Sequence, residues 1–495
     1  MSGPARKPRV RTREDPGRYQ PCVRCGGCYP TYGHWPEGIV CEHCVYKAKN
    51  TMGACVACGH EGVVPGVDDA GRPLCRGCSG ITLHVDCLRC GFEGWLCAGD
   101  LCSRCWLADK VDALLQGSEG GTPVALRPLA DAIKNMRSAN SGVTWLRNRA
   151  VSGLLRQLAV GEVRLSHEAL DALPASRTVE YIRGLLVQHG ALPRRDERLA
   201  TYQRWLDAKL AAVEDPEQRR LIQAFGRWHL IPHLRRQAEQ GGVTPNSFLR
   251  AKQSCTVAIG FLAWLAARGR TVADWTQHDL DAWFSAGPST RKHALPFIYW
   301  SIKTRRAQRL RVPAWEARTH PKLGEEQRLE ALRRLLLNDE IHLHWRVAGS
   351  FVVLYGQPAD RIVELSLDRL SAPEDGPLRV RLATDWVDVP EPLATLVRAH
   401  LSSRPNMQTA ANKDCEWLFP GSMPGRPMNV DGLVTKLRGI GVPVMATKTG
   451  AWQQLVREGP PSVLAEALGI SPVTAMRHAQ RAGADWLRYA ALRSS

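Results

Sequence analysis

The chain has 495 residues, which is too long for one hydrophobic core, so we expect several domains. Its net charge of +18 and pI of about 9.5 concern the partner rather than the fold, and they favour nucleic acid over an acidic protein. No apolar run approaches the ~20 residues that span a bilayer and no secretory signal opens the sequence, so we expect a cytoplasmic, nucleoid-associated protein without membrane partners.

The first element is a short basic arm over residues 1–20. Its run PARKPRVRTRED combines several arginines with little apolar content, so we do not expect it to build a core. The arm either lies along phosphates or only keeps the chain soluble.

A dense cysteine array follows, and it holds all of the 16 cysteines except Cys255 and Cys415. Without an export signal, disulfides are not expected, and the spacing favours metal binding instead. Two C-x-x-C turns together supply four thiolates to one tetrahedral zinc ion. The array contains six such pairs in series: Cys22/Cys25, Cys41/Cys44, Cys55/Cys58, Cys75/Cys78, Cys87/Cys90 and Cys102/Cys105.

Pairing neighbouring C-x-x-C turns in chain order predicts three serial zinc ribbons over residues 21–108, with about three zinc ions. A cross-brace, in which the first and third pairs share a metal, is the alternative. The serial order is favoured because a glycine suited to a left-handed turn follows every other pair, at Gly26, Gly59 and Gly91.

The role of the ribbons is left open. The metal either substitutes for a core too small to form otherwise or supports contacts with DNA or a protein partner. Arginines inside the knuckles suit either partner: Arg24, Arg76, Arg89 and Arg104. Cys28 and Cys97 are left over, and each is able to replace a neighbouring ligand.

Helical sequence follows the ribbons. The glycine-rich run LLQGSEGGTPVAL predicts a hinge. Apolar residues at three- and four-residue spacing predict a small helical module over residues 120–193, in which Ser166 begins a helix. A second helical block covers residues 196–313, where recurring tryptophans and leucines are expected to form the core.

Basic residues near the helix ends of the second block are candidate DNA contacts. A helix with one apolar face and several arginines on the other is able to lie along phosphates, and a solvated basic face is the alternative. The candidates are Arg250, Lys252, Arg291, Lys292, Lys303, Arg305, Arg306, Arg309 and Arg311.

Two stretches of the second half stand in a familiar order. Helical sequence runs from TYQRWL at residue 201 to RVP at residue 313, and VAGSFVVLYGQPADRIVELSLDRL follows. Together they resemble the core-binding domain and first catalytic box of the tyrosine recombinases, the phage-integrase-like enzymes. The resemblance implies a C-terminal α+β, mostly α, domain over residues 320–495, in which Arg361 holds a DNA phosphate with its guanidinium fork. The whole chain also resembles actinobacterial proteins described as integrase-like or regulator-like.

Several catalytic residues that the resemblance implies are replaced. The hairpin LRVRLATDWVDVP carries Ala383, Thr384 and Asp385 at its turn, where the family has a lysine. The H-x-x-R box of the family falls on Met445–Lys448, so methionine replaces the histidine and lysine replaces the arginine. Lysine keeps the charge but loses the bidentate fork.

The last catalytic box is altered as well. The family's histidine falls on Ile470, and its nucleophilic tyrosine falls on Ala479, beside His478. Losing one group that stabilises the transition state costs roughly two to three orders of magnitude in rate, so strand cleavage is not expected. Arg361, Lys448 and Tyr489, the only later tyrosine, remain as candidate remnants of a catalytic site.

The stretch LAEALGISPVTAMRHA near the C-terminus predicts a helix-turn-helix. Gly469 turns the chain, and Ser471 or Pro472 starts the second helix. The guanidinium of Arg477 suits a guanine, and the Val473 side chain suits a thymine methyl group. An ordinary helical hairpin is the alternative. The side chains expected to face DNA are Ser471, Val473, Thr474, Arg477 and Arg481.

The expected architecture is therefore multidomain, with zinc ribbons, a mainly α-helical middle and a recombinase-like C-terminal domain. The favoured function is a non-enzymatic protein that clamps double-stranded DNA on a decayed recombinase scaffold, as a regulator or assembly factor, with self-association on the DNA. An active recombinase using Arg361, Lys448 and Tyr489 is the second hypothesis. A ribbon scaffold that recruits a protein partner is the third.

Overall fold

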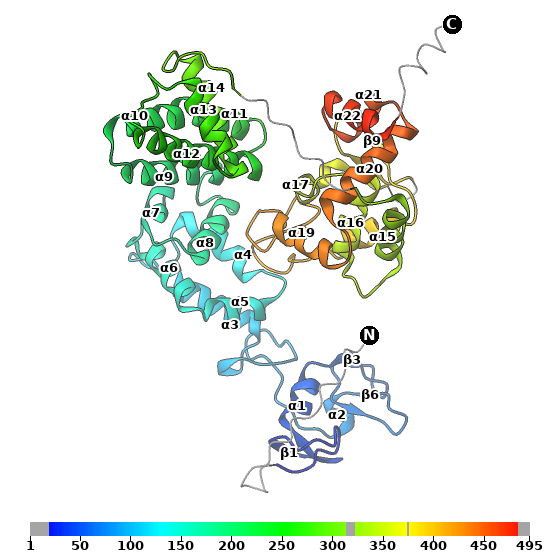
Figure 1. Ribbon diagram of the computed structural model, residues 1–495. Helices are drawn as coiled ribbons and strands as arrows, with labels where there is room; N and C mark the ends of the chain where they lie inside the picture. Colours follow the sequence, from blue (N-terminus) through cyan, green and yellow to red (C-terminus); the bar gives the residue numbers. More distant parts are fainter. Residues whose placement is uncertain (1–18, 313–321, 374–375, 484–495) are drawn as a thin grey trace. The chain divides into compact units, whose positions relative to one another are not determined.

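The computed structural model describes residues 19–312, 322–373 and 376–483, and these residues are mostly helical (Figure 1). The chain divides into two compact units. The first contains Met1–Leu192, Leu365–Asp368 and Ala399–Asn429, and the second contains Pro193–Glu364, Arg369–Arg398 and Val430–Ser495. No helix in the described part combines the length and the apolar character needed to cross a membrane.

The cysteine-rich region forms small antiparallel hairpins that share one core. β1 pairs with β2, β3 with β4 and β5 with β6. Val40, Val63 and Val85 lie in one buried cluster, so successive ribbons pack on each other instead of standing apart. The elements are β1 (Thr31–Trp35), β2 (Gly38–Cys41), α1 (Glu42–Lys49), β3 (Met52–Ala54), β4 (Glu61–Val63), β5 (Gly66–Val67), β6 (Pro73–Leu74), α2 (Arg76–Ser79) and η1 (Ala98–Asp100).

A helical module follows without a break. Its elements are α3 (Ser103–Leu114), η2 (Val124–Leu126), α4 (Arg127–Lys134), α5 (Ala139–Leu146), α6 (Arg149–Val160), α7 (His167–Ala172) and α8 (Arg177–Gln188). The first of these helices is capped by Cys102, whose sulfur accepts from the amide of Cys105, and it carries Leu107 and Val111 into the core of the module. The glycine-rich run has buried residues near its two ends, Leu115 and Leu126, while Gly120 and Gly121 between them are exposed and take left-handed backbone angles. Its role as a hinge remains a prediction.

A distant stretch of the chain completes this core. Ala410 and Ala411 are buried in the same cluster as the helices of the module. The Ser138 amide donates to the carbonyl of Gln408 (3.0 Å), and the His189 ring bonds to the carbonyl of Ala410 (3.0 Å). Part of the sequence expected in the C-terminal domain thus packs on the helical module, and the domain boundaries set out above remain a prediction.

The second unit begins with a helical block whose interior is aromatic. Phe225, Phe261 and Phe297 are fully buried, together with Trp275. Its helices are drawn in green in Figure 1. They are α9 (Glu197–Ala211), α10 (Pro216–Phe225), the π-helical turn η3 (Gly226–Leu230), α11 (Ile231–Glu239), α12 (Pro245–Ala266), α13 (Gln277–Ser285), η4 (Ser289–Ala294) and α14 (Leu295–Lys303).

The C-terminal elements combine helices with one small sheet of order β7-β8-β9. The predicted hairpin is confirmed, with Arg381 opposite Trp386 across its turn. The elements are α15 (Glu325–Leu337), α16 (Leu343–Tyr355), α17 (Ala359–Val363), η5 (Leu367–Arg369), β7 (Leu370–Ser371), β8 (Arg379–Arg381), β9 (Trp386–Asp388), α18 (Leu393–Ser402), α19 (Val430–Gly439), α20 (Val444–Glu458), α21 (Pro461–Leu468) and α22 (Pro472–Ala482).

Two predicted helix starts are confirmed by their capping bonds. The Ser166 hydroxyl accepts from the amide of Ala169 (3.2 Å), and the Ser471 hydroxyl accepts from the amide of Thr474 (3.2 Å). Each bond satisfies one of the free amides in the first helical turn.

Gly356 joins α16 to α20 and supplies a test of this packing. Its φ is +59°, its carbonyl accepts from the Trp452 indole (3.1 Å), and an added Cβ would lie 2.6 Å from that ring. We expect Gly356→Ala to destabilise the fold by about 2–4 kcal/mol, because left-handed backbone and overpacking both cost free energy. Urea unfolding measures this loss. Gly260→Ala is the control: that glycine lies inside α12 with open space around it, so no loss is expected. Equal stability of the two variants would contradict the packing.

Candidate functional site

The twelve paired cysteines converge into three groups of four. The groups follow chain order, so the first and second pairs meet, then the third and fourth, then the fifth and sixth. Within each group all four sulfur atoms lie within 4.8 Å of one another. This is the serial arrangement and not the cross-brace. Cys28 and Cys97 belong to none of these groups in the part of the chain that the structure describes.

The sulfur geometry fits a tetrahedral metal centre. Zn–S bonds of about 2.3 Å place the sulfurs of a tetrahedron about 3.8 Å apart. The corresponding sulfur–sulfur distances are 3.8 Å for Cys25 and Cys41, 3.6 Å for Cys58 and Cys75, and 3.7 Å for Cys90 and Cys102. Four soft thiolates at these spacings could hold a metal ion such as zinc.

Backbone amides prepare one thiolate in each group. The Cys102 amide donates to the sulfur of Cys87 (3.2 Å) and lowers the pKa of that thiol to about 6. The Cys75 amide lowers the pKa of Cys55 to about 6 in the same way. Gly26, Gly59 and Gly91 take φ of +65°, +75° and +69°, so the left-handed turns expected after these pairs are confirmed.

The knuckle arginines are largely neutralised. The guanidinium of Arg76 binds Asp86 (2.7 Å) and Glu93 (2.7 Å), and Arg89 binds Asp109 (2.6 Å). Arg24 pairs with Glu37. These side chains hold the ribbon region together, and this leaves them less available for phosphates.

The basic candidates in the helical block fall into two groups. Three lie over aromatic rings: Arg291 over Trp283 (4.1 Å to the centroid), Lys252 over Trp205 (5.1 Å) and Arg306 over Trp300 (5.2 Å). Others are exposed and form no ion pair with any carboxylate of the described residues: Arg250, Lys303, Arg305, Arg309 and Arg311. The second group is free to meet an external anion.

The pKa values of two histidines are lowered in part by these nearby cations. Burial lowers the pKa of His293, and Lys292 and Arg250 lower it further. Burial also lowers the pKa of His229, with additional effects of His233, Lys303 and Arg236. A positive charge on either ring is disfavoured because the surrounding charge is already positive.

A second basic cluster forms around Arg361. Its guanidinium donates to the carbonyls of Leu468 (3.5 Å) and Gly469, at the end of α21. The buried Gln357 amide also donates to Leu468 (2.9 Å). The turn of the β8–β9 hairpin lies against the same glycine, since a Cβ on Gly469 would be 3.0 Å from Ala383.

Lys448 and His478 complete this group, which we call the Arg361 cluster. Burial lowers the pKa of Lys448; Asp360 acts against that shift and Arg361 adds to it. Burial lowers the pKa of His478, with Arg481, Lys448 and Arg477 contributing. The structure thus brings Arg361 and Lys448 together. Tyr489 lies outside the described residues.

The helix α22 presents the side chains expected to face outward. Val473 is 68% exposed, and Ser471, Arg477 and Arg481 are also exposed, while Ala475 and Ala479 are buried. Thr474 is only partly exposed. The two-helix geometry is present, and base recognition by it remains a prediction.

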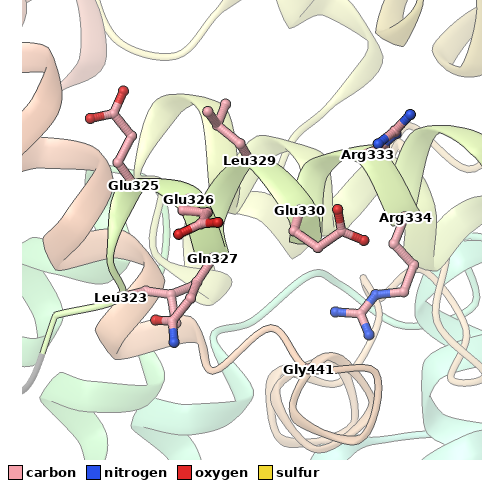
Figure 2. A pocket seen from close by; sticks show the side chains of 9 residues that line it. All are labelled: Leu323, Glu325, Glu326, Gln327, Leu329, Glu330, Arg333, Arg334 and Gly441. Atoms are coloured by element: carbon pink, nitrogen blue, oxygen red, sulfur yellow. The ribbon is translucent and has the colours of Figure 1, made fainter.

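A hollow of about 1000 Å³ lies along α15 and differs in character (Figure 2). It is lined by Leu323, Glu325, Glu326, Gln327, Leu329, Glu330, Arg333, Arg334 and Gly441. Its three glutamates repel phosphate. Among the described residues, these glutamates belong to no group of side chains close enough together to bind a metal ion.

Comparison with solved structures finds partial likenesses. One is the XerH site-specific recombinase bound to its difH substrate in a pre-cleavage complex, at 12% identity and a TM-score of 0.35, covering 57% of this chain and 92% of that chain. Another is the XerA recombinase, at 15% identity and a TM-score of 0.27, covering 46% and 85%. No family model and no curated protein matches the chain.

Sequence reasoning missed two features of these sites. It did not foresee that α3 joins the third cysteine group to the helical module, because that link depends on how α3 packs against α4, α5 and α6. It also missed the π-helical turn at η3. The sequence carries no clear signal for it, since the buried Gly226 and Leu230 are four residues apart, as in an ordinary α-helix.

The continuity of α3 predicts how metal loss spreads. Cys105→Ser removes a ligand from the third group at the start of this helix, so we expect loss of one of three bound metal ions and loosening of the helical module. Tryptic cleavage after Arg183, a side chain only 2% exposed, should become roughly tenfold faster or more.

Cys25→Ser is the matched control, because it also removes one ligand but from the first group. It should lose one ion and leave Arg183 protected. Elemental analysis and timed digestion provide the two readouts. Far fewer than three ions on the unaltered chain would refute the centres, and equal cleavage in both variants would contradict the coupling.

Proposed function

We propose that this chain binds double-stranded DNA without cutting it, and that residues 193–312 supply most of the phosphate contacts. The location of the charge carries the proposal. These residues include 21 Lys and Arg but only 10 Asp and Glu, which accounts for +11 of the total +18. A dense positive field of this kind favours a polyanion, and duplex DNA carries one negative charge per about 1.7 Å of its helix axis.

The exposed cations of this block support the same conclusion. Lys303 ends α14 and Arg305 and Arg309 lie in the segment after it, and no carboxylate of the described residues neutralises them. Arg250 is exposed on α12, close enough to His293 to shift its pKa. Charges without partners cost little to bring to a phosphate, because no existing ion pair has to be broken.

The Arg361 cluster is proposed as a further phosphate contact. Lys448 is partly buried without an ion pair to any described carboxylate, and one guanidinium nitrogen of Arg361 is used on helix carbonyls. An anion placed here would compensate the buried positive charge. The exposed Arg477 and Val473 belong to the same proposal as contacts to bases.

The chemistry of the cluster argues against cleavage. Strand transfer needs a nucleophile and hydrogen-bond donors beyond positive charge. Met445 and Ile470 stand where the resemblance implies histidines, and neither side chain donates to a phosphate. Ala479 has no nucleophilic atom. Enclosure of the duplex and self-association on it remain predictions.

We propose zinc as the metal of the three cysteine groups. The ion would be held by the four thiolates of each group and would cross-link strands too short to fold on apolar burial alone. Residues 21–108 contain seven Lys and Arg against eight Asp and Glu. Lacking excess positive charge, this region is better suited to a protein partner than to phosphates.

Salt dependence tests the DNA proposal. Replacing Lys303, Arg305 and Arg309 by Gln should weaken duplex binding at every sequence and reduce the slope of log affinity against log salt by about 3, or about 1 per phosphate contact. Fluorescence anisotropy on a labelled duplex measures both.

A control triple variant removes the same charge from arginines that are already paired. Arg72, Arg227 and Arg379 bind Asp68, Asp207 and Asp388 at 2.8 Å. Changing these three to Gln should leave the slope nearly unchanged. Equal slopes for both triple variants, or affinity independent of salt, would argue against the proposed contacts.

An active enzyme is the second candidate, favoured by the proximity of Arg361 and Lys448. On supercoiled and nicked DNA we expect no covalent protein–DNA adduct, because Ala479 replaces the nucleophile. Denaturing electrophoresis of labelled DNA detects such an adduct. Its appearance, together with its loss in Tyr489→Phe, would overturn the non-enzymatic proposal.

A further inference from the structure

Trp228 is unusually open to solvent. It is 80% exposed, more than the other exposed tryptophans of the described residues, Trp386 at 43% and Trp95 at 44%. A tryptophan has a large apolar face, so leaving it in water forgoes a sizeable gain from burial. The exposed Trp228 ring is therefore suited to binding a partner that packs flat against it.

The backbone explains how this ring comes to face outward. Trp228 lies in η3, a π-helical turn inserted between α10 and α11. Gly226 and Leu230 at the two ends of the turn are buried, while the three residues between them, Arg227, Trp228 and His229, are exposed. Gly226 permits close packing here, since a Cβ would lie 2.6 Å from Leu206. Such single π turns recur at functional sites.

Positively charged groups lie near the residue that follows Trp228. The next residue, His229, has its pKa lowered by burial and by the nearby His233, Lys303 and Arg236. Acidic groups are few on these elements: Asp207 is paired with Arg227 (2.8 Å), and Glu239 lies at the far end of α11. The electrostatic setting therefore suits a negatively charged partner.

A second aromatic ring accompanies these cations. Tyr299 is 55% exposed on α14, one helical turn before Lys303. Phe297 and Trp300 of α14 contact Phe225 at the start of the π-helical turn (5.4 and 5.5 Å between ring centroids), so the helix that carries Tyr299 and Lys303 packs beside the turn that carries Trp228. Rings interleaved with cations are the arrangement by which proteins bind bases and phosphates of one strand together.

We propose that Trp228 stacks on an unstacked nucleobase while the neighbouring cations bind the adjoining phosphates. The site would take single-stranded DNA, or a base displaced from a duplex. This inference rests on the proposed DNA binding and extends it to distorted DNA. An apolar protein surface fits less well, because covering the ring would also desolvate the cations without neutralising them.

The test compares three probes on the full chain by fluorescence anisotropy: a single-stranded oligonucleotide, the same sequence as a perfect duplex, and that duplex with a one-base bulge. Trp228→Ala should weaken binding to the single strand and the bulged duplex by roughly ten- to a hundredfold, the usual worth of one stacked base. Binding to the perfect duplex should change less than about twofold, because phosphate contacts are retained. Loss on the bulged duplex alone would identify a displaced base as the ligand, and loss on both would identify any unstacked base.

Two variants control the comparison. Trp228→Phe keeps a flat ring and should retain most of the affinity. Trp386→Ala removes another exposed tryptophan, with Arg381 over its ring (5.3 Å), and should change none of the three affinities. If Trp228→Ala binds all three probes as tightly as the unaltered chain, the stacking site is overturned while duplex binding stands. If the unaltered chain binds no probe, both proposals fail.

Discussion

Mutual repulsion among the cations of residues 193–312 is the constraint on which the account depends. A net charge of +11 within 120 residues disfavours a compact state, so the helices must be held by something stronger. The aromatic interior supplies it, with Phe225, Phe261 and Phe297 fully buried. Other aromatic rings of the block position part of the charge, because Arg291 lies over Trp283 and Arg306 lies over Trp300. A polyanion would relieve the repulsion and so stabilise the folded block.

The positive charge is also distributed unevenly along the chain. The cysteine-rich residues 21–108 have no excess of positive charge. Arginines of this region form ion pairs with nearby carboxylates, as Arg76 does with Asp86 and Arg89 with Asp109. Metal-binding thiolates add further negative charge to that region. Phosphate binding and ribbon contacts therefore belong to different parts of the molecule. The Arg361 cluster differs from both regions. Its Lys448 is partly buried, and its Arg361 donates a hydrogen bond to a carbonyl at the end of α21.

Features fixed by short-range chemistry could be predicted from the sequence. The C-x-x-C spacing and the alternating glycines favour the serial cysteine groups that the structure shows, with the cross-brace as the alternative. The capping of helices by Ser166 and Ser471 needs only three neighbouring residues. The β8–β9 hairpin follows from alternation.

Features that depend on distant packing could not be predicted. The burial of Ala410 among helices far earlier in the chain has no local signal. The hydrogen bond from Arg361 to the carbonyl of Gly469 has no local signal either. It engages a side chain that was expected to bind only a phosphate. Tyr489 lies outside the described residues, and its assignment as a remnant remains a prediction.

Hydrogen–deuterium exchange of the full chain, with and without a DNA duplex, tests the central claim most directly. The account predicts that duplex slows exchange at the start of α12, at η4 and at the end of α14, because Arg250, Lys292 and Lys303 lie there. Exchange in residues 21–108 should stay unchanged. Slowing confined to residues 21–108, with none in the helical block, would contradict the account.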